Sequence, residues 1–374
     1  MSRDPAHTFY EFFAGGGMAR LGLGDGWRCL FANDFDPLKA ATYRANFEDA
    51  DSHLRQGDIW ALTPEDLPGA PDLAWASSPC QDFSLAGSRA GLAGGRSSAF
   101  FGFWKLMQGL AAEDRAPRVI VIENVTGLLT SHGGADFEAL CAALHAQGYR
   151  FGALEIDAGL FTPQSRPRVF VVAMRHPSPP EGPSPFHTRG VRAAFERLSP
   201  ALKQAWVWWS LAAPARRNAD LASMLEPDGV CAWRTADQTA QLLNLMDSRN
   251  RAKVDLLAQG PSRHVGTVFR RIRAGRQRAE VRFDGVAGCL RTPGGGSSRQ
   301  LLLLIEDGEV KSRWLTAREG ARLMGLADDY LLPRAQSPGL KVIGDGVVVP
   351  VVRHLTAGLL EPLLMDRAGK PAAA

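Results

Sequence analysis

The sequence predicts an α/β protein: a doubly wound, mostly parallel sheet of the Rossmann-like class, with a smaller inserted domain. Short apolar runs alternate with helical stretches between residues 7 and 174. The runs are apolar at consecutive positions, which is typical of parallel strands covered by helices on both faces. The length of 374 residues exceeds that of one ordinary domain, since a domain averages roughly 150 residues. The second half of the chain lacks the alternation, so we expect it to hold the smaller domain.

Five strands are expected in the first half of the chain, with helices between them. Helical patterns cover 98–112 and 135–147. Parallel neighbours need such crossover connections, so the alternation itself favours a parallel sheet. The strands are expected at 7–13, 28–34, 71–77, 118–124 and 168–174.

The second half begins with a proline-rich linker, HPSPPEGPSP, after which the texture of the sequence changes. Farther along, LLLLIED predicts a strand, and T-A-R-E predicts a helix that begins at Thr316 with a capping box. A turn and a last helix follow. We expect a large domain at 1–175, a small domain at 176–339, and a segment at 340–374 that returns to the large domain.

Composition excludes several classes of protein. Hydrophobic residues make up 45% of the chain and charged residues 22%, which argues against disorder. Five scattered cysteines without a C-x-x-C pair argue against a disulfide framework and a cysteine zinc site, and no metal is expected. The sequence has neither a run of ~18 apolar residues nor the start of a signal peptide. We therefore expect a soluble, cytoplasmic protein that does not enter membranes.

Consecutive glycines follow the first expected strand and precede a helix. Gly15 and Gly17 can let a ligand approach the backbone, although a lone glycine is more often just a tight turn. The dinucleotide fingerprint fails, because its third glycine position holds Arg20. Asp34 ends the next strand, where it can bind a ribose or, alternatively, cap a helix. With Asp58 at the same edge, the pattern indicates a nucleoside cofactor that has no diphosphate.

Cysteine, glutamate and arginine side chains follow the later strands. Cys80 comes directly after the third strand, where a reactive thiol would lie at the carboxyl edge of the sheet; otherwise a lone cysteine is a buried structural residue. Glu123 ends the fourth strand, as a site residue or as a cap or surface charge. Arg166 and Arg168 point to the same side of the fifth strand, or lie in an exposed turn.

These residues lie in motifs that resemble those of the prokaryotic cytosine-C5 DNA methyltransferases, which depend on S-adenosylmethionine. The motifs occur in that family's order and approximate spacing. They are FFAGGG, PCQDFS, IENV, QSRPRVF, R-x-L-T-x-R-E-x-x-R-L-x-G and GDGVVVP. The resemblance covers residues 8–175 and 286–357. It implies a class I methyltransferase fold, with catalysis in the large domain and target recognition in the inserted one.

The resemblance implies a role for each candidate residue. Cys80 is expected to add to C6 of a cytosine that is flipped out of duplex DNA, which gives a covalent intermediate. Glu123 is expected to assist at N3 and N4 of the base, and Arg166 and Arg168 to hold it. S-adenosylmethionine is expected to bind and to leave as S-adenosylhomocysteine. Its expected contacts are Phe13, Gly15, Gly17, Asp34, Phe35, Asp58, Ile59, Pro79 and Asp345.

Some positions depart from the family's pattern. Met18 stands where a glycine is frequent, Asp345 where an asparagine is frequent, and Cys289 where a threonine is usual. The C-F-T segment of the tRNA-methylating branch is absent from the sequence, which favours DNA. The alternatives are a catalytically silent relative that binds DNA or cofactor, and the same chemistry on tRNA. A nicotinamide oxidoreductase would leave the PCQ and ENV motifs unexplained.

The region between the motifs carries seven arginines at 261–282 against the single acid Glu280. We expect this segment to bind DNA phosphates, with a solvated charged face as the alternative. The tryptophans of WVWW at 206–209 are expected in a core rather than on a base. The expected partners are double-stranded DNA and a cognate restriction endonuclease, for a monomeric enzyme associated with the nucleoid. The target sequence cannot be read from this region.

Overall fold

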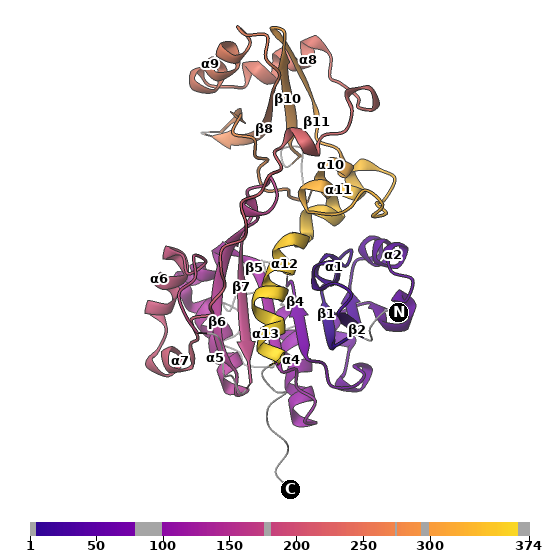
Figure 1. The fold of residues 1–374 in the computed structure, drawn as a ribbon, viewed down its shortest axis with the longest axis vertical. Coiled ribbons are helices and arrows are strands. Elements are labelled where there is room, and N and C mark those ends of the chain that lie inside the picture. Colours follow the sequence, from indigo (N-terminus) through magenta and orange to yellow (C-terminus); the bar gives the residue numbers. More distant parts are fainter. Residues whose placement is uncertain (1–4, 79–98, 176–180, 274, 293–298, 366–374) are drawn as a thin grey trace. The chain divides into compact units, whose positions relative to one another are not determined.

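The computed structural model describes residues 5–78, 99–175, 181–273, 275–292 and 299–365. The chain forms two compact units (Figure 1). The first comprises Met1–Asp157, Pro167–Ala215 and Val349–Ala374, and the second comprises Ala158–Arg166 and Arg216–Val348. Residues 181–215 thus belong to the first compact unit and residues 340–348 to the second. The expected division into functional domains, with boundaries after residues 175 and 339, stays a prediction.

The first unit is built on a seven-stranded sheet with the order β3-β2-β1-β4-β5-β7-β6. Its neighbours pair in parallel except β7, which is antiparallel to both β5 and β6. The strands are β1 His7–Phe12, β2 Trp27–Asp34, β3 Leu54–Gln56, β4 Leu73–Ala76, β5 Val119–Val125, β6 Arg150–Asp157 and β7 Pro167–Met174. All five expected strands are present, and the doubly wound, mostly parallel sheet is confirmed.

Helices on both faces bury the central strands, which explains why apolar residues occupy consecutive positions in them, as in β4 (LAWA). Side chains of α4 and α5 form one large core with β1, β4, β5 and β7. On the face drawn in Figure 1, α12 and α13 lie in front of the sheet. The helices of this unit are α1 Met18–Leu23, α2 Pro37–Asn46, α3 Ala50–His53, α4 Ala99–Ala112, α5 Ala135–Ala146, α6 Arg189–Arg197, α7 Pro200–Ala205, α12 Val349–Leu355 and α13 Glu361–Met365.

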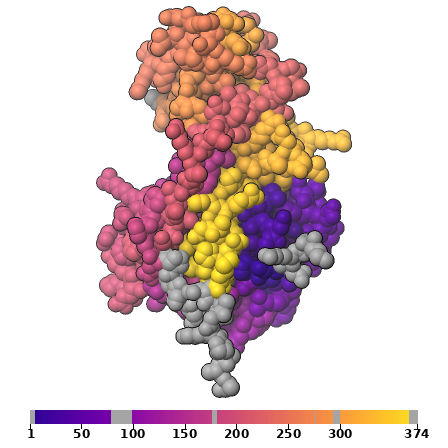
Figure 2. Space-filling model, in the orientation of Figure 1, coloured from indigo at the N-terminus to yellow at the C-terminus, as the bar shows by residue number. Residues whose placement is uncertain are grey.

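The C-terminal helices α12 and α13 belong to the first unit. In Figure 2 the atoms of α12 and α13 (yellow) lie beside those of the N-terminal segment (indigo). A Cβ atom added to Gly22 of α1 would lie only 2.3 Å from the Cβ of Val352 in α12, so a glycine is needed for the two helices to meet. The expected core position of the clustered tryptophans is also confirmed, because Trp206 and Trp209 are buried in this unit.

The second unit is built on a four-stranded antiparallel sheet with the order β11-β10-β8-β9. Its strands are β8 His264–Arg273, β9 Arg276–Arg282, β10 Leu301–Glu306 and β11 Glu309–Trp314, and its helices are α8 Ala236–Asn244, α9 Ser248–Leu257, α10 Ala317–Leu323 and α11 Gln336–Asp345. Leu301, Leu303 and Ile305 of β10 face α8 and α9 in a small separate core. The expected strand at LLLLIED and the capping box of Thr316 with Glu319 are confirmed.

One stretch, Gln336–Met365, is long and apolar enough to cross a membrane by length and composition alone. However, 61% of its most apolar window is buried inside the protein. Burial of this kind is typical of core helices, so the stretch does not indicate a membrane protein.

Candidate active site

The turn between β1 and α1 has an unusual backbone. Phe13, Gly15 and Gly17 all have positive φ angles, of 58°, 57° and 81°. Such values are uncommon for a residue with a side chain and gather at functional sites, so Phe13 marks this turn more strongly than the glycines do. Among the residues that the structure describes, no atom except those of Gly15 and its chain neighbours lies within 4 Å of a Cβ atom added to Gly15. The backbone at Gly15 is therefore open to a ligand.

Asp34 fixes this turn to the end of β2. One of its carboxylate oxygens accepts a hydrogen bond from the Gly15 N–H, and the other accepts one from the Asp36 N–H, each at 2.8 Å. Burial raises the pKa of Asp34. The helix-cap alternative is wrong for this residue, because Asp36 caps α2 by accepting from Leu38 and Lys39. Each oxygen of a carboxylate has two lone pairs, so Asp34 can still accept a bond from a ligand hydroxyl.

The ends of β2 and β3 bring the remaining nucleoside candidates to the same edge. Asp34 pairs with Gln56 in the parallel register, which places Asp58 just beyond. The Asp58 carboxylate caps a short helical turn by accepting from Trp60 N, whereas the Ile59 side chain is buried in the core. Phe35 is 74% exposed, although it follows a buried strand directly. An aromatic ring this exposed is available to stack on a ligand.

Glu123 and Arg168 form an ion pair where β5 and β7 run side by side. The Arg168 Nε lies 3.1 Å from a Glu123 carboxylate oxygen, and both side chains are largely buried. The antiparallel register explains the contact, because Val125 pairs with Arg168 and Glu123 with Phe170. A carboxylate and a guanidinium side by side offer both hydrogen-bond acceptors and donors to one planar ligand.

Asn124 holds the end of β4 against this pair, although sequence reasoning gave it no role. Its side-chain amide donates to the carbonyl oxygen of Ser78 at 3.0 Å, and its own oxygen accepts from Val125 N. Ser78 is buried, and it is the last described residue before Pro79 and Cys80. The two predicted site residues Pro79 and Cys80 lie outside the described residues. A buried amide within an apolar strand was the available signal for Asn124.

Arg166 belongs to the second unit and is buried there. Its guanidinium donates to the backbone carbonyls of Leu290 at 2.7 Å, Gly344 at 2.9 Å and Gly346 at 2.8 Å. It thus joins segments that are far apart in the sequence. Asp345, a predicted cofactor residue, lies between two of these carbonyls and accepts a hydrogen bond from the Thr292 hydroxyl.

Gln164 supports the same region and was also missed. Its side-chain nitrogen donates to Leu323 O at 2.9 Å, and its oxygen accepts from Leu290 N at 3.1 Å. The residue is fully buried, so its amide replaces hydrogen bonds that water would otherwise provide. The QSRPR motif therefore contains two buried residues, Gln164 and Arg166, whose side chains hydrogen-bond to distant backbone segments, and it also contains Arg168, which forms the ion pair.

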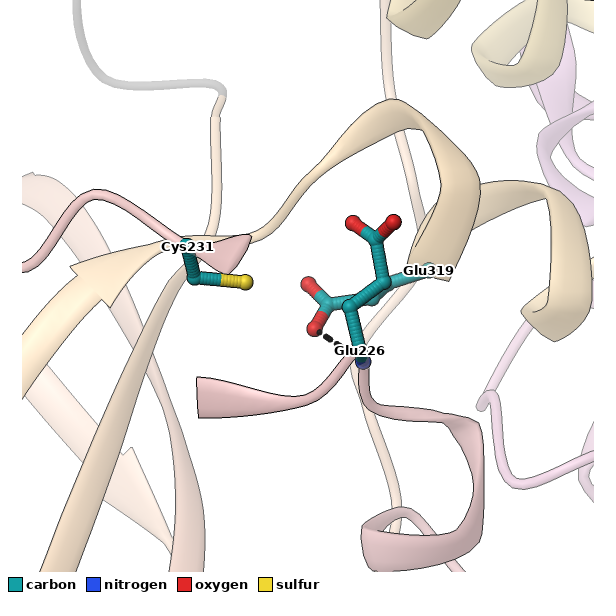
Figure 3. A group of neighbouring side chains, drawn as sticks. All are labelled: Glu226, Cys231 and Glu319. Carbon is teal, nitrogen blue, oxygen red and sulfur yellow. Dashed lines mark hydrogen bonds between the residues drawn. The ribbon is translucent and has the colours of Figure 1, made fainter. Parts of the chain in front are cut away.

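Glu226, Cys231 and Glu319 place their ligand atoms within 4.8 Å of one another in the second unit (Figure 3). Protein donors account for the acidic oxygens. Glu319 accepts from the Arg313 guanidinium at 2.5 and 2.9 Å and from the N–H groups of Thr316 and Glu226, and the Thr316 hydroxyl donates to Glu226. Arg313 already balances the buried negative charge, so this group is explained as a buried ion pair.

Comparisons with known proteins agree on one family. A sequence profile of the C-5 cytosine-specific DNA methylases matches residues 7–361. Type II methyltransferase M.BsuFI of Bacillus subtilis is 26% identical over 373 residues, covering 96% of this chain and 73% of the relative. M.HpaII of Haemophilus parainfluenzae is also 26% identical, covering 95% and 90%. The crystal structure of S. pombe Dnmt2 methyltransferase has a similar fold, with a TM-score of 0.62 at 18% identity over 96% of this chain and 99% of that one.

Proposed function

The chain belongs to the C-5 cytosine-specific DNA methylase family, and from this premise we propose that it methylates C5 of a flipped-out cytosine within a specific duplex DNA sequence, using Cys80 as nucleophile. The observation that supports this best is the buried pair of Glu123 and Arg168 beside the strand that leads to Cys80. Carboxylate and guanidinium groups there suit the polar edge of a cytosine.

The proposed cofactor is S-adenosylmethionine, and the residues present fit it. The backbone at Gly15 is open, Phe35 offers an exposed ring, and each Asp34 oxygen retains a lone pair for a ribose hydroxyl. When bound, the cofactor supplies an electrophilic methyl group and becomes S-adenosylhomocysteine. We propose that it is held by Phe13, Gly15, Gly17, Asp34, Phe35, Asp58, Ile59, Pro79 and Asp345.

The protein's own side chains carry the remaining chemistry. Addition of the Cys80 thiolate to C6 raises the electron density at C5, the carbon that is methylated. Glu123 assists this addition by hydrogen bonding at N3 and N4, and Arg168 holds the other side of the base. Loss of the C5 proton and elimination of Cys80 then release 5-methylcytosine. We propose that Arg166, named with Arg168 as a base-holding residue, acts by positioning, because its guanidinium holds three backbone carbonyls.

The relatives named above are type II methyltransferases, which supports a role for this protein in restriction–modification. The proposed enzyme acts as a monomer in the cytoplasm, associated with the nucleoid through DNA, and protects sites that a cognate restriction endonuclease would cut. No metal is required by the proposed chemistry.

The test is methyl transfer from labelled S-adenosylmethionine to mixed-sequence duplex DNA and, separately, to tRNA, with products mapped at single-base resolution. Label on C5 of cytosine within one short DNA motif is the expected result. Label on tRNA alone would move the substrate to RNA and keep the mechanism. Cofactor binding without any label would identify a catalytically silent relative instead.

A further inference from the structure

The β8–β9 hairpin extends beyond the sheet of the second unit. β10 pairs with β8 only over His264–Val268, whereas β8 and β9 pair with each other as far as Arg273 and Arg276. The outer part of the hairpin, residues 270–273 and 275–278, is therefore a two-stranded ribbon with no third strand beside it among the residues that the structure describes; we call it the arginine ribbon. An isolated two-stranded ribbon gains little stability from its own pairing. Its sequence is thus freer to serve a purpose other than the fold.

The strand register sorts the ribbon's side chains into two faces. Residues directly opposite each other in an antiparallel pair share a face, and successive residues alternate between faces. Arg271 is opposite Arg278, and Arg273 is opposite Arg276, so four arginines share one face. Ile272, opposite Gln277, lies on the other face and is 72% exposed.

The other three arginines of the 261–282 segment serve contacts within the unit. Arg263 pairs with Asp228 and Glu306, and Arg282 pairs with Asp284. Arg270 lies over the Trp314 ring, 4.9 Å from its centroid. The structure thus divides the basic segment expected from the sequence into three structural arginines and the four on the ribbon face.

Folding alone does not explain the four-arginine face. Like charges directly opposite each other on two strands are destabilising. Glu280 lies 3.5 Å from both Arg271 and Arg273, and the charge of Arg278 also acts on the Asp247 carboxylate, so the acids nearby are fewer than the four cations. Among the residues that the structure describes, no carboxylate lies within 4 Å of Arg276 or Arg278. A high arginine content of the whole chain would not by itself place four of them on one face.

We infer that the arginine ribbon binds the sugar-phosphate backbone of duplex DNA through Arg271, Arg273, Arg276 and Arg278. This inference rests on the proposed function, whose substrate supplies the anion. The major groove of B-DNA admits a two-stranded β-ribbon, and guanidinium groups suit phosphate oxygens. Contacts with phosphates position a protein on DNA without reading its sequence. The ribbon therefore contributes affinity and register, and the choice of target lies elsewhere.

The test measures binding of fluorescent duplex DNA by the full-length Arg276→Gln/Arg278→Gln variant between about 50 and 200 mM salt. Each lost phosphate contact lowers the slope of log K against log salt by about 0.9, so we expect a reduction of roughly 2. Affinity should fall by a similar factor for a DNA containing the methylated motif and for one lacking it. The inference would be overturned if the variant still methylated DNA and kept the wild-type salt slope of binding. It would also be overturned if the variant lost affinity only for the DNA that contains the motif.

Two controls separate binding from folding. Ile272→Ala/Gln277→Ala changes the opposite face of the same ribbon, and Arg251→Gln removes one charge that is paired with Asp255 on α9. Both should keep the wild-type slope. The midpoint of thermal unfolding of the arginine variant should stay the same or rise, since like-charge repulsion is removed; a clear fall would show that the arginines serve the fold. Wild-type protein that methylates no DNA would instead contradict the proposed function.

Discussion

The charged groups of the two proposed sites, one in each unit, are held in opposite ways. In the first, Glu123 and Arg168 are largely buried and fixed to each other at 3.1 Å between two strands. In the second, Arg276 and Arg278 lie on a ribbon that no third strand supports in the part of the chain that the structure describes. Chemistry on one atom of a base needs groups held in one geometry, whereas phosphate binding needs charge that a large polyanion can reach. The difference indicates that reaction and DNA binding can be damaged separately.

The sharpest way to separate them is Cys80→Ser. A hydroxyl is a far weaker nucleophile than a thiolate near neutral pH, so we expect methyl transfer to fall at least about 10³-fold. Affinity for duplex DNA and its salt dependence should not change. Radiolabel transfer measures the first effect and fluorescence anisotropy the second. Cys231→Ser, a matched control in the second unit, should keep its activity; methyl transfer that survives Cys80→Ser would contradict the mechanism.

Glu123→Gln tests the proposed catalytic acid of the first unit. Loss of a positioned acid typically lowers a rate by about 10² to 10⁴, and we expect kcat to fall within that range while the salt slope of DNA binding stays the same. Single-turnover methyl transfer measures the effect on chemistry. The exposed Glu196, paired with Lys203 on the surface, gives the matched control Glu196→Gln, which should be fully active. An equal loss of methyl transfer in both variants would show that Glu123 has no specific part in the reaction.

The buried ion pair of the second unit predicts a large effect on stability. Glu319→Gln leaves Arg313 charged and buried, and breaking one side of such a pair costs about 3 to 5 kcal/mol. Chemical denaturation should show this loss in the free energy of unfolding. The control is Glu309→Gln, whose exposed pair with Lys311 is worth about 0 to 1 kcal/mol. Similar values for the two variants would mean that burial does not decide the strength of these pairs.

A smaller effect depends on pH and comes from the first unit. Burial raises the pKa of Glu11 to about 8, while nearby Arg20 lowers it. The folded protein therefore keeps a proton on Glu11 at pH values where the unfolded chain has lost it, so stability falls as the pH rises towards 8. We expect a loss of roughly 2 kcal/mol between about pH 6 and pH 8 from this group.

Glu11→Gln should remove this part of the pH dependence, because the amide does not titrate. Urea denaturation at several pH values measures it, with Glu48→Gln on the surface as the control. A pH profile of stability that is the same in Glu11→Gln and wild type would show that the buried carboxyl does not titrate in this range.

The sequence predicted the first unit far better than the second, for a physical reason. Strands such as Val119–Val125 are buried on both faces and so begin with an unbroken apolar run, here Val119 to Ile122, which a sequence shows directly. The last three residues of β8, Arg271 to Arg273, are exposed on both faces, so their sequence lacks the apolar pattern that indicates a strand. The antiparallel direction of β7 and the left-handed Phe13 depend on tertiary contacts that no local pattern contains.

The candidate site was predicted in the same uneven way. Glu123 lies near the end of β5 and Arg168 near the start of β7, and these two strands pair with each other. The two side chains therefore lie together and form an ion pair. Asp36 rather than Asp34 caps α2, because which of two nearby acids meets the helix N–H groups depends on the turn between them. Asn124 and Gln164 were missed because an amide acts through partners that are distant in the sequence.

The outward extension of the arginine ribbon also bears on how this protein can change during evolution. Its inner neighbours Val268, Ala279 and Val281 are buried in the small core, whereas the four arginines of the ribbon face do not belong to that core. Codons for the outer residues can thus mutate, or be exchanged for those of another hairpin of equal length, without repacking the domain. New DNA-binding properties are then accessible without loss of the fold. Variation among natural relatives should accordingly concentrate at the end of this hairpin.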